Sequence, residues 1–261
     1  MRTWISPEEA REAIRRGKGK GVRVAILDSG VEAAHPALNG LVLADDVAVV
    51  EDGMKLVAVP GEGRDLFGHG TAVAGIIRTV APEAEIGSFR VLGEALASRT
   101  AIILEGARLA IEGGYHILNC SLGCGVPEHV LKYKSWVDEA YLKGVHVVAA
   151  CNNHDFARPE WPAFFTSVLT VNMARTDANG ELYYKPGHLV EFAARGIDVE
   201  VPWLDGTKKK VTGSSFAAPR VSGMLACLLS EVPNLPPLQA KALLHQLALP
   251  WNREMTAPNE R

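Results

Sequence analysis

Short apolar runs alternate with segments of helical periodicity along most of the chain. The first run, Val22–Leu27, lies between glycines and predicts a buried strand with Asp28 at its carboxyl end. Further apolar runs predict strands at about 85–91, 115–120, 145–150 and 168–173. This alternation predicts an α/β fold in which helices flank a mostly parallel sheet.

The segments between these runs carry helix signals. Ser6-Pro7-Glu8-Glu9 combines a capping residue, a proline and a carboxylate, which predicts a helix ending at about Arg16. Apolar residues at three- and four-residue spacing, and long apolar segments near the C-terminus, predict four more helices, at Arg99–Glu112, Val130–Leu142, Ser215–Val232 and Pro236–Leu247. Because no linker or repeat is visible, we interpret residues 1–261 as a single domain, with residues 1–20 as a helical extension packed on it.

Composition and charge exclude several classes of partner. The 27 basic and 30 acidic residues leave a net charge of -3, and the basic runs are short, so nucleic acid is not an expected partner. Because no stretch reaches the roughly 18 apolar residues of a membrane span, we expect no membrane partner. The cysteines lack the paired spacing of a zinc site and predict no metal. Free thiols, a native-looking Met1 and no signal peptide predict a cytoplasmic protein.

Three glycine-flanked segments carry residues suited to nucleophilic chemistry, namely Asp28-Ser29-Gly30, Gly68-His69-Gly70 and Gly213-Ser214-Ser215. Acyl transfer needs a hydroxyl, an imidazole that takes its proton and a carboxylate that orients the imidazole. Each residue alone is ordinary, since Asp28 could end a strand and Ser215 could cap a helix. Together, Asp28, His69 and Ser215 predict a catalytic triad.

The three segments, in this order, resemble the signatures of the subtilisin-like serine peptidases, the subtilase family. The resemblance includes His35-Pro36 after the first motif, Val-Ala-Gly after the second and Phe-Ala-Ala-Pro after Ser215, and it extends from about residue 20 to about residue 248. It implies a three-layer sandwich with a mostly parallel central sheet. It also implies a serine endopeptidase that needs no cofactor and hydrolyses peptides or proteins through an acyl-enzyme on Ser215. His69 would be the general base and acid, and Asp28 would orient it.

Two further segments resemble substrate-binding parts of the family. Ser121, Leu122 and Gly123 match the extended segment that pairs with substrate backbone, although an ordinary buried strand fits them equally. The run from Gly144 resembles the strand that delivers the oxyanion asparagine, but the family's Gly-Asn is replaced by Asn152-Asn153. Counting without gaps makes Asn153 the donor. Asn152 then takes the glycine position, where a left-handed backbone is compatible with asparagine. A shift of one residue would exchange the two roles.

The resemblance also bears on specificity and metal binding. Asp155 and Glu160 fall at or near the walls and floor of the primary specificity pocket, where a carboxylate would favour Lys or Arg before the cleaved bond. Both could instead face solvent, and Glu160 could plug the pocket. Ala37 replaces an aspartate of the family's tight calcium site, and residues 76–82 leave no room for its loop, so we predict no calcium there.

The sequence leaves alternatives for how activity is regulated and for whether water or an amine takes the acyl group. No inhibitory pro-domain is recognisable, and we interpret the helix at 7–16 as a packing element rather than an autoinhibitory segment. A peptide ligase or macrocyclase, a peptide-maturation protease and a non-catalytic peptide-binding pseudoprotease are the alternatives to general hydrolysis. The oligomeric state is not predicted.

Overall fold

The structure, a computed structural model, describes residues 5–177 and 180–251. Its described part contains a ten-stranded sheet in the order β12-β8-β9-β7-β6-β5-β1-β4-β2-β3, and a separate antiparallel pair, β10-β11. The strands are β1 Arg23–Asp28, β2 Asp46–Asp52, β3 Lys55–Pro60, β4 Glu85–Arg90, β5 Ile117–Cys120, β6 His146–Ala150, β7 Leu169–Ala174, β8 Leu182–Tyr184, β9 Phe192–Arg195, β10 Val199–Pro202, β11 Lys208–Val211 and β12 Leu249–Pro250. Strands β2, β4, β1, β5, β6, β7 and β9 pair in parallel, which gives the sheet its predicted character.

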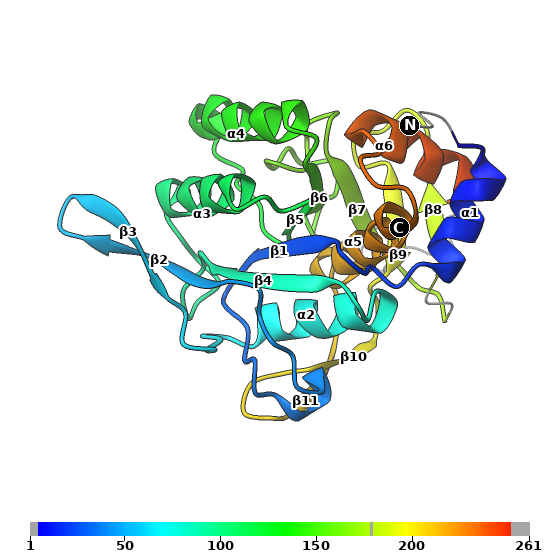
Figure 1. Cartoon of the computed structure of the whole chain (residues 1–261). Helices are drawn as coiled ribbons and strands as arrows, with labels where there is room; N and C mark the ends of the chain where they lie inside the picture. Colours follow the sequence, from blue (N-terminus) through cyan, green and yellow to red (C-terminus); the bar gives the residue numbers. More distant parts are fainter. Residues whose placement is uncertain (1–4, 178–179, 252–261) are drawn as a thin grey trace.

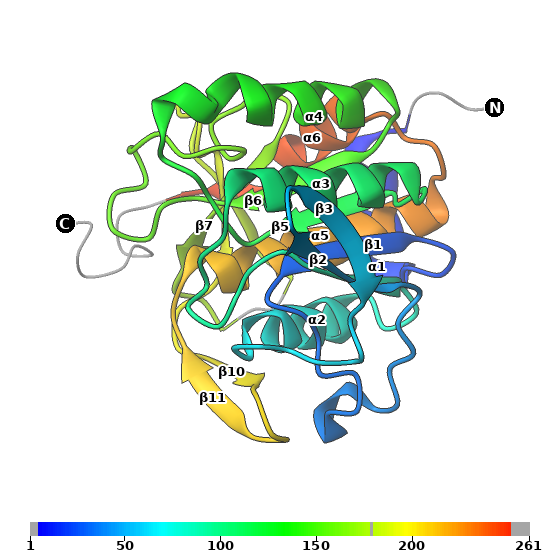
Figure 2. The same ribbon diagram turned by 90° about the vertical axis from the view of Figure 1, so that its left-hand side faces the viewer.

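Helices cover both faces of this sheet (Figures 1 and 2). The α-helices of the described part are α1 Pro7–Arg16, α2 His69–Val80, α3 Thr100–Glu112, α4 Val130–Leu142, α5 Ser214–Glu231 and α6 Pro237–Leu247. Side chains alternate along β1, so Val24 and Ile26 face the core under α1, α2, α5 and α6, whereas Ala25 and Leu27 face the core under α3 and α4. The predicted three-layer sandwich is confirmed.

The long apolar elements lie where the sequence predicts them, within a few residues at each end. Helix α4 has the predicted bounds, and α3 begins at Thr100 because Arg99 is its N-cap. The hairpin β2-β3 was not predicted, and it projects from the body of the molecule (Figure 1). Each strand carries an apolar run of four residues, at 47–50 and 56–59, on either side of a turn at Gly53, and this hairpin signal was overlooked. Strands β8 to β12 were also missed.

Helix α1 begins with the capping residues that the sequence predicts. Ser6 Oγ accepts a hydrogen bond from the Glu9 backbone N–H at 3.2 Å, and the Glu9 carboxylate accepts one from the Ser6 N–H at 2.8 Å, which completes a capping box. Ala10 and Ala13 are buried in the core beside α5. A Cβ at residue 17 would lie 2.2 Å from the Cys227 carbonyl oxygen, so the close approach of α1 to α5 requires Gly17. Residues 1–4 of the predicted extension and 252–261 of the predicted domain lie outside the described residues.

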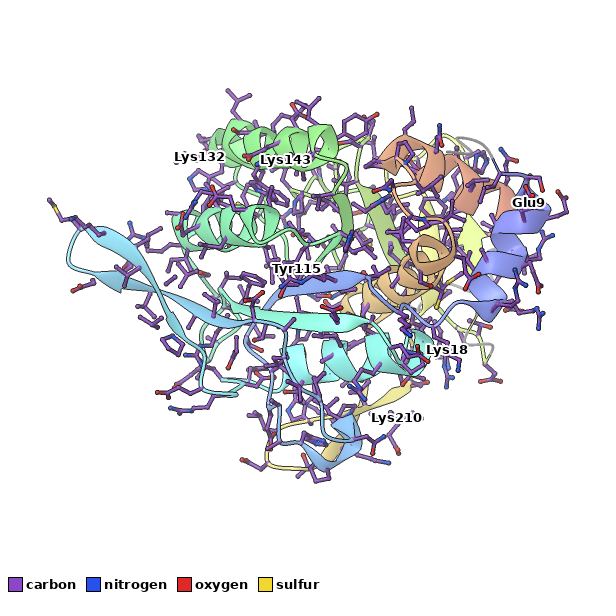
Figure 3. The ribbon with its side chains drawn as sticks, viewed as in Figure 1. Glu9, Lys18, Tyr115, Lys132, Lys143 and Lys210 are labelled. Atoms are coloured by element: carbon purple, nitrogen blue, oxygen red, sulfur yellow. The ribbon has the colours of Figure 1, made fainter. Side chains whose placement is uncertain are left out.

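The outer surface of the sandwich is charged. Glu9, Lys132, Lys143 and Lys210 point outward, whereas Tyr115 lies between α3 and β1 (Figure 3). No helix in the described ranges is long and apolar enough to span a membrane.

The topology creates a crevice at one edge of the sheet. The chain places β4 on one side of β1 and the later strand β5 on the other, so the strand order reverses at β1. Strands β4, β1, β5 and β6 run parallel, and their carboxyl ends therefore meet at the same edge. In open α/β sheets, ligands bind at this reversal, outside the carboxyl ends of the strands. The motifs of interest lie there.

Candidate active site

Asp28 and His69 form a buried hydrogen-bonded pair at this edge. Asp28 ends β1, and His69 is the first residue of α2. His69 Nδ1 lies 2.8 Å from Asp28 Oδ1 and 2.9 Å from Oδ2, and Asp28 is 0% and His69 6% exposed. Because an ionised carboxylate only accepts hydrogen bonds, Nδ1 carries the proton. The other ring nitrogen, Nε2, is thus left to accept a proton from a nucleophile.

A second carboxylate, Asp65, fixes the start of α2. Its oxygens accept hydrogen bonds of 2.7–2.9 Å from the backbone N–H groups of Phe67, Gly68 and Thr71 and from the hydroxyls of Thr71 and Ser29. Gly68 precedes His69 with φ of 102°, a conformation that favours glycine. Asp65 was not predicted from the sequence, although an acidic residue just before a helix start is a capping signal.

These carboxylates set the charge state of His69. Burial is the largest influence and by itself lowers the pKa of the imidazole. The charge of Asp28, its hydrogen bond and the charge of Asp65 together outweigh burial, so the pKa of His69 is raised above its ordinary value. The site therefore stabilises the imidazolium that forms when His69 takes a proton.

Ser215 lies in the first turn of α5, directly after Gly213 and Ser214. Ser215 and His69 line one cavity of about 550 Å³. The neighbouring Phe216 packs its ring 5.1 Å from the His69 ring, centroid to centroid. The N–H groups of a first helical turn have no partner within the helix, so the Ser215 N–H can bind an anion. The structure thus brings the three predicted triad residues to one site.

The two asparagines after β6 differ in their hydrogen bonds. Asn153 Oδ1 accepts from the Ser214 backbone N–H at 2.8 Å, which identifies it as the carbonyl oxygen because a backbone N–H only donates. No described residue accepts from Asn153 Nδ2. Asn152 instead uses both ends of its amide, since Nδ2 donates to Glu160 and Oδ1 accepts from the N–H groups of His154 and Asp155. Of the two, Asn153 has the donor that is left for a substrate.

The prediction of a left-handed backbone conformation at Asn152 is wrong. Asn152 is absent from the described non-glycine residues with positive φ. Its side chain forms a local turn with the N–H groups of His154 and Asp155 and reaches across to Glu160, and these contacts hold the segment without a glycine-like conformation.

The predicted substrate residues divide into two groups. Ser121, Leu122, Gly123 and Glu160 line the same cavity as Ser215. Ser121 Oγ also donates to the Ser215 carbonyl oxygen at 2.9 Å and so links the segment after β5 to α5. Asp155 is not a lining residue. It is exposed, and its carboxylate accepts from the Ala157 N–H at 3.0 Å.

The segments where we predict that the family's tight calcium site is missing are Ala37 and helix α2. Helix α2 runs without interruption from His69 to Val80, and Ala37 lies in the short helical turn Pro36–Leu38. Within residues 5–177 and 180–251, no group of three or more His, Cys, Asp or Glu side chains is arranged to hold a metal ion. The absence of calcium itself stays a prediction.

Comparison with known proteins agrees with this geometry. The family model described as the Subtilase family matches residues 19–260. The chain belongs to the subtilase family. This subtilase is 30% identical to Subtilisin Savinase of Lederbergia lenta, over 94% of this chain and 90% of that protein. It is also 30% identical to Thermitase of Thermoactinomyces vulgaris, over 85% of this chain and 80% of that protein.

Other relatives are longer, and one solved structure is similar in fold. The identity to M-protease of Shouchella clausii is 30% over 94% of this chain, which spans 63% of the length of M-protease. The crystal structure of a cold adapted subtilisin-like serine proteinase superposes with a TM-score of 0.70 and 27% identity, over 88% of this subtilase and 83% of that chain.

Proposed function

We propose that this subtilase is a serine endopeptidase that hydrolyses peptides or proteins through an acyl-enzyme on Ser215. One observation carries the proposal. The Asp28–His69 pair has its free imidazole nitrogen available, and His69 shares a cavity with the Ser215 hydroxyl and the Asn153 amide. These are the base, nucleophile and oxyanion donor that acyl transfer requires.

Acylation begins when Ser215 Oγ attacks the carbonyl carbon of the bond to be cleaved. His69 Nε2 takes the hydroxyl proton and then gives it to the leaving amine. Asp28 holds the proton on Nδ1, which keeps His69 in the tautomer that can act as a base. Water then attacks the acyl-enzyme with His69 again as base, and Ser215 is released.

The tetrahedral oxyanion would be bound by two donors. One is Asn153 Nδ2, because the other end of this amide is held by Ser214. The second is the backbone N–H of Ser215 at the start of α5, where the helix dipole also favours negative charge. Both donors are positioned before substrate binds, so little free energy is spent on reorganising them during reaction.

Substrate would bind as an extended strand beside Ser121–Gly123. This segment continues from β5 at the edge of the cavity. Main-chain hydrogen bonds to such a strand are independent of side chains, so they suit a peptidase that accepts many sequences. We retain the interpretation of one catalytic domain, with α1 as a packing element rather than an inhibitor.

We also propose that the protein works in a reducing compartment, the cytoplasm. The support is that Cys120, Cys124 and Cys227 are free thiols, and two of them are buried. Fractionating the producing cells and detecting the protein with an antibody tests this, and recovery only in the medium would contradict it.

The central test is labelling of Ser215 with a fluorophosphonate probe, read by mass spectrometry. We expect one adduct on Ser215, none in Ser215→Ala, and cleavage of test peptides to linear products. A folded protein that takes no adduct would instead be a peptide-binding pseudoprotease. Labelling with cyclic or ligated products would identify a ligase.

A further inference from the structure

The cavity beside Ser215 has an unusual balance of charge. Among its lining residues, Glu160 is the one carboxylate, and none is a lysine or arginine. The remaining ionisable groups of the lining are histidines, cysteines and a tyrosine. With its histidines neutral, the cavity therefore carries a negative charge, and the group that complements it is a cation.

Two sets of contacts fix the position of Glu160 in the cavity. On one side, Asn152 Nδ2 donates to Glu160 Oε1 at 2.6 Å, and the Asn152 amide is itself fixed by the N–H groups of His154 and Asp155. On the other side, Cys124 and Trp161 exchange two backbone hydrogen bonds of 2.9 Å, which place Glu160 against Gly123. These contacts preorganise the carboxylate.

Gly123 leaves space for the Glu160 carboxylate, and no basic side chain that the structure describes neutralises its charge. A Cβ at residue 123 would lie only 2.8 Å from Glu160 Oε2, so Gly123 makes the space. The half-buried Glu160 forms no ion pair with any lysine or arginine of the described chain, and its amide partner is neutral. A partly desolvated carboxylate without a counter-charge favours a bound cation.

We propose that Glu160 makes this subtilase selective for Lys or Arg at the residue before the cleaved bond. The inference rests on the proposed peptidase function. The carbonyl that Ser215 attacks belongs to that residue, so its side chain branches from the Cα next to the attacked carbon, beside the cavity that Ser215 and Glu160 line. A long side chain with a terminal cation can reach along the wall to Glu160, and an arginine can form two hydrogen bonds with the carboxylate.

Asp155 provides a matched control. It lies five residues from Glu160 in the same loop, but it is exposed and does not line the cavity. Asp155→Asn therefore removes the same charge from the same region as Glu160→Gln, without changing the cavity. Any effect that depends on the overall charge of the loop appears in both variants, whereas selectivity set in the cavity changes in Glu160→Gln alone.

The test measures kcat/KM for peptides that differ only in the residue before the cleaved bond, namely Arg, Lys, Leu, Phe and Ala. We expect the wild-type protein to favour Arg and Lys over Leu and Phe by about 10-fold or more. Glu160→Gln should lower the Arg and Lys values by about 10- to 100-fold and change the Leu and Phe values little. Asp155→Asn should leave the ratios unchanged.

Three results would overturn the proposal. A wild-type preference for Leu or Phe would exclude a cation-selective cavity, and an equal loss on all substrates in Glu160→Gln would reduce Glu160 to a structural role. A preference for Ala that shifts to larger residues in Glu160→Ala would mean that Glu160 plugs the cavity.

Binding to the Ser215→Ala variant separates this proposal from the peptidase function. Calorimetry with peptides ending in Arg or Leu should give tighter binding of the Arg peptide by about 10-fold or more. If the variant binds the two peptides equally while Ser215 of the wild-type protein reacts with fluorophosphonate, only the proposed specificity is overturned. A wild-type protein that is neither labelled nor active, and whose variant binds neither peptide, overturns both.

Discussion

Two buried histidines at opposite edges of the same sheet have opposite acid–base behaviour. His69 lies at the carboxyl edge and is 6% exposed, whereas His146 begins β6 at the amino edge and is 2% exposed. Burial is the largest influence on both and favours the neutral ring. The pKa of His69 is nevertheless raised, whereas burial lowers the pKa of His146 to about 4.

Their partners explain the difference. His69 has the charges of Asp28 and Asp65 beside it. His146 Nε2 donates to the Leu235 carbonyl oxygen at 3.1 Å, and its Nδ1 has no hydrogen-bond partner in the described chain. A carbonyl dipole offsets little of the cost of a buried charge, while a carboxylate offsets much of it. A buried histidine becomes a base for chemistry only where the fold also buries an anion against it.

The strongest way to break this contrast is to make His69 resemble His146. Asp28→Asn keeps the shape of the side chain but removes the charge and lets the amide favour the wrong tautomer. We expect kcat/KM at neutral pH to fall by about 10⁴-fold, the loss known for the same change in a Ser-His-Asp triad. Circular dichroism should show an unchanged fold. A loss below about tenfold would mean that Asp28 does not orient the base.

The second test separates the two asparagines of the carboxyl edge. Asn153→Ala removes the free amide donor and should lower kcat by about 100- to 1,000-fold, a size taken from the related enzyme subtilisin. Asn152→Ala breaks the contact to Glu160 and should change kcat far less, with its main effect on the preference for basic substrates. If Asn152→Ala gave the larger loss of kcat, the order of the pair would be reversed.

Part of the candidate site could be predicted from the sequence, and part could not. The motifs around Asp28, His69 and Ser215 were sufficient to predict which residues come together, because each residue lies at a recognisable strand end or helix start. The roles of Asn152 and Asn153 could not be separated in the same way. They depend on which amide reaches Ser214, in a distant segment, and which reaches Glu160 across an irregular loop, and no local sequence pattern reports either contact.

The sequence also left other features of the fold and the site unpredicted. Asp155 and Glu160 are both acidic and lie close together in the sequence, but only Glu160 is turned into the cavity, because Trp161 pairs with Cys124. The hairpin β2-β3 was missed although its sequence carries a hairpin signal, because it adds an antiparallel pair at one end of a sheet for which parallel strands and crossover helices were expected. Asp65 was missed because it lies in a loop that has no periodicity, and its hydrogen bonds to Ser29 and Thr71 depend on how that loop meets β1 and α2.

The third test concerns the amino edge and measures stability. The lowered pKa of His146 means that the unfolded chain takes up its proton from about pH 6.5, whereas the folded chain does so near pH 4. The stability from this histidine is complete above pH 6.5 and is lost as the pH falls toward 4, by up to about 3 kcal/mol.

His146→Gln keeps an N–H for the Leu235 carbonyl and cannot be protonated, so it isolates this effect. Urea unfolding at pH 7, 5.5 and 4 should show a smaller loss of unfolding free energy in the variant than in the wild-type protein. Parallel losses in both proteins would assign the acid sensitivity to other groups.

The finest test removes only the more distant anion from His69. Asp65→Asn lowers the pKa of His69, and because the neutral imidazole is the base, the acidic limb of kcat/KM should move to lower pH. The shift should be smaller than in Asp28→Asn, because the hydrogen-bonded carboxylate stays in place. Asp65→Asn also disturbs the start of α2. One oxygen of Asp65 accepts from both the N–H and the hydroxyl of Thr71, and an amide nitrogen in its place can accept neither hydrogen bond.

Thr71→Val controls for this disturbance, because it removes the hydroxyl contact to Asp65 and leaves the charge unchanged. If the acidic limb moves in Asp65→Asn but not in Thr71→Val, then the charge of Asp65 acts on His69 across the helix start. If both variants move it equally, Asp65 acts only by holding the helix, and Asp28 alone would distinguish His69 from His146.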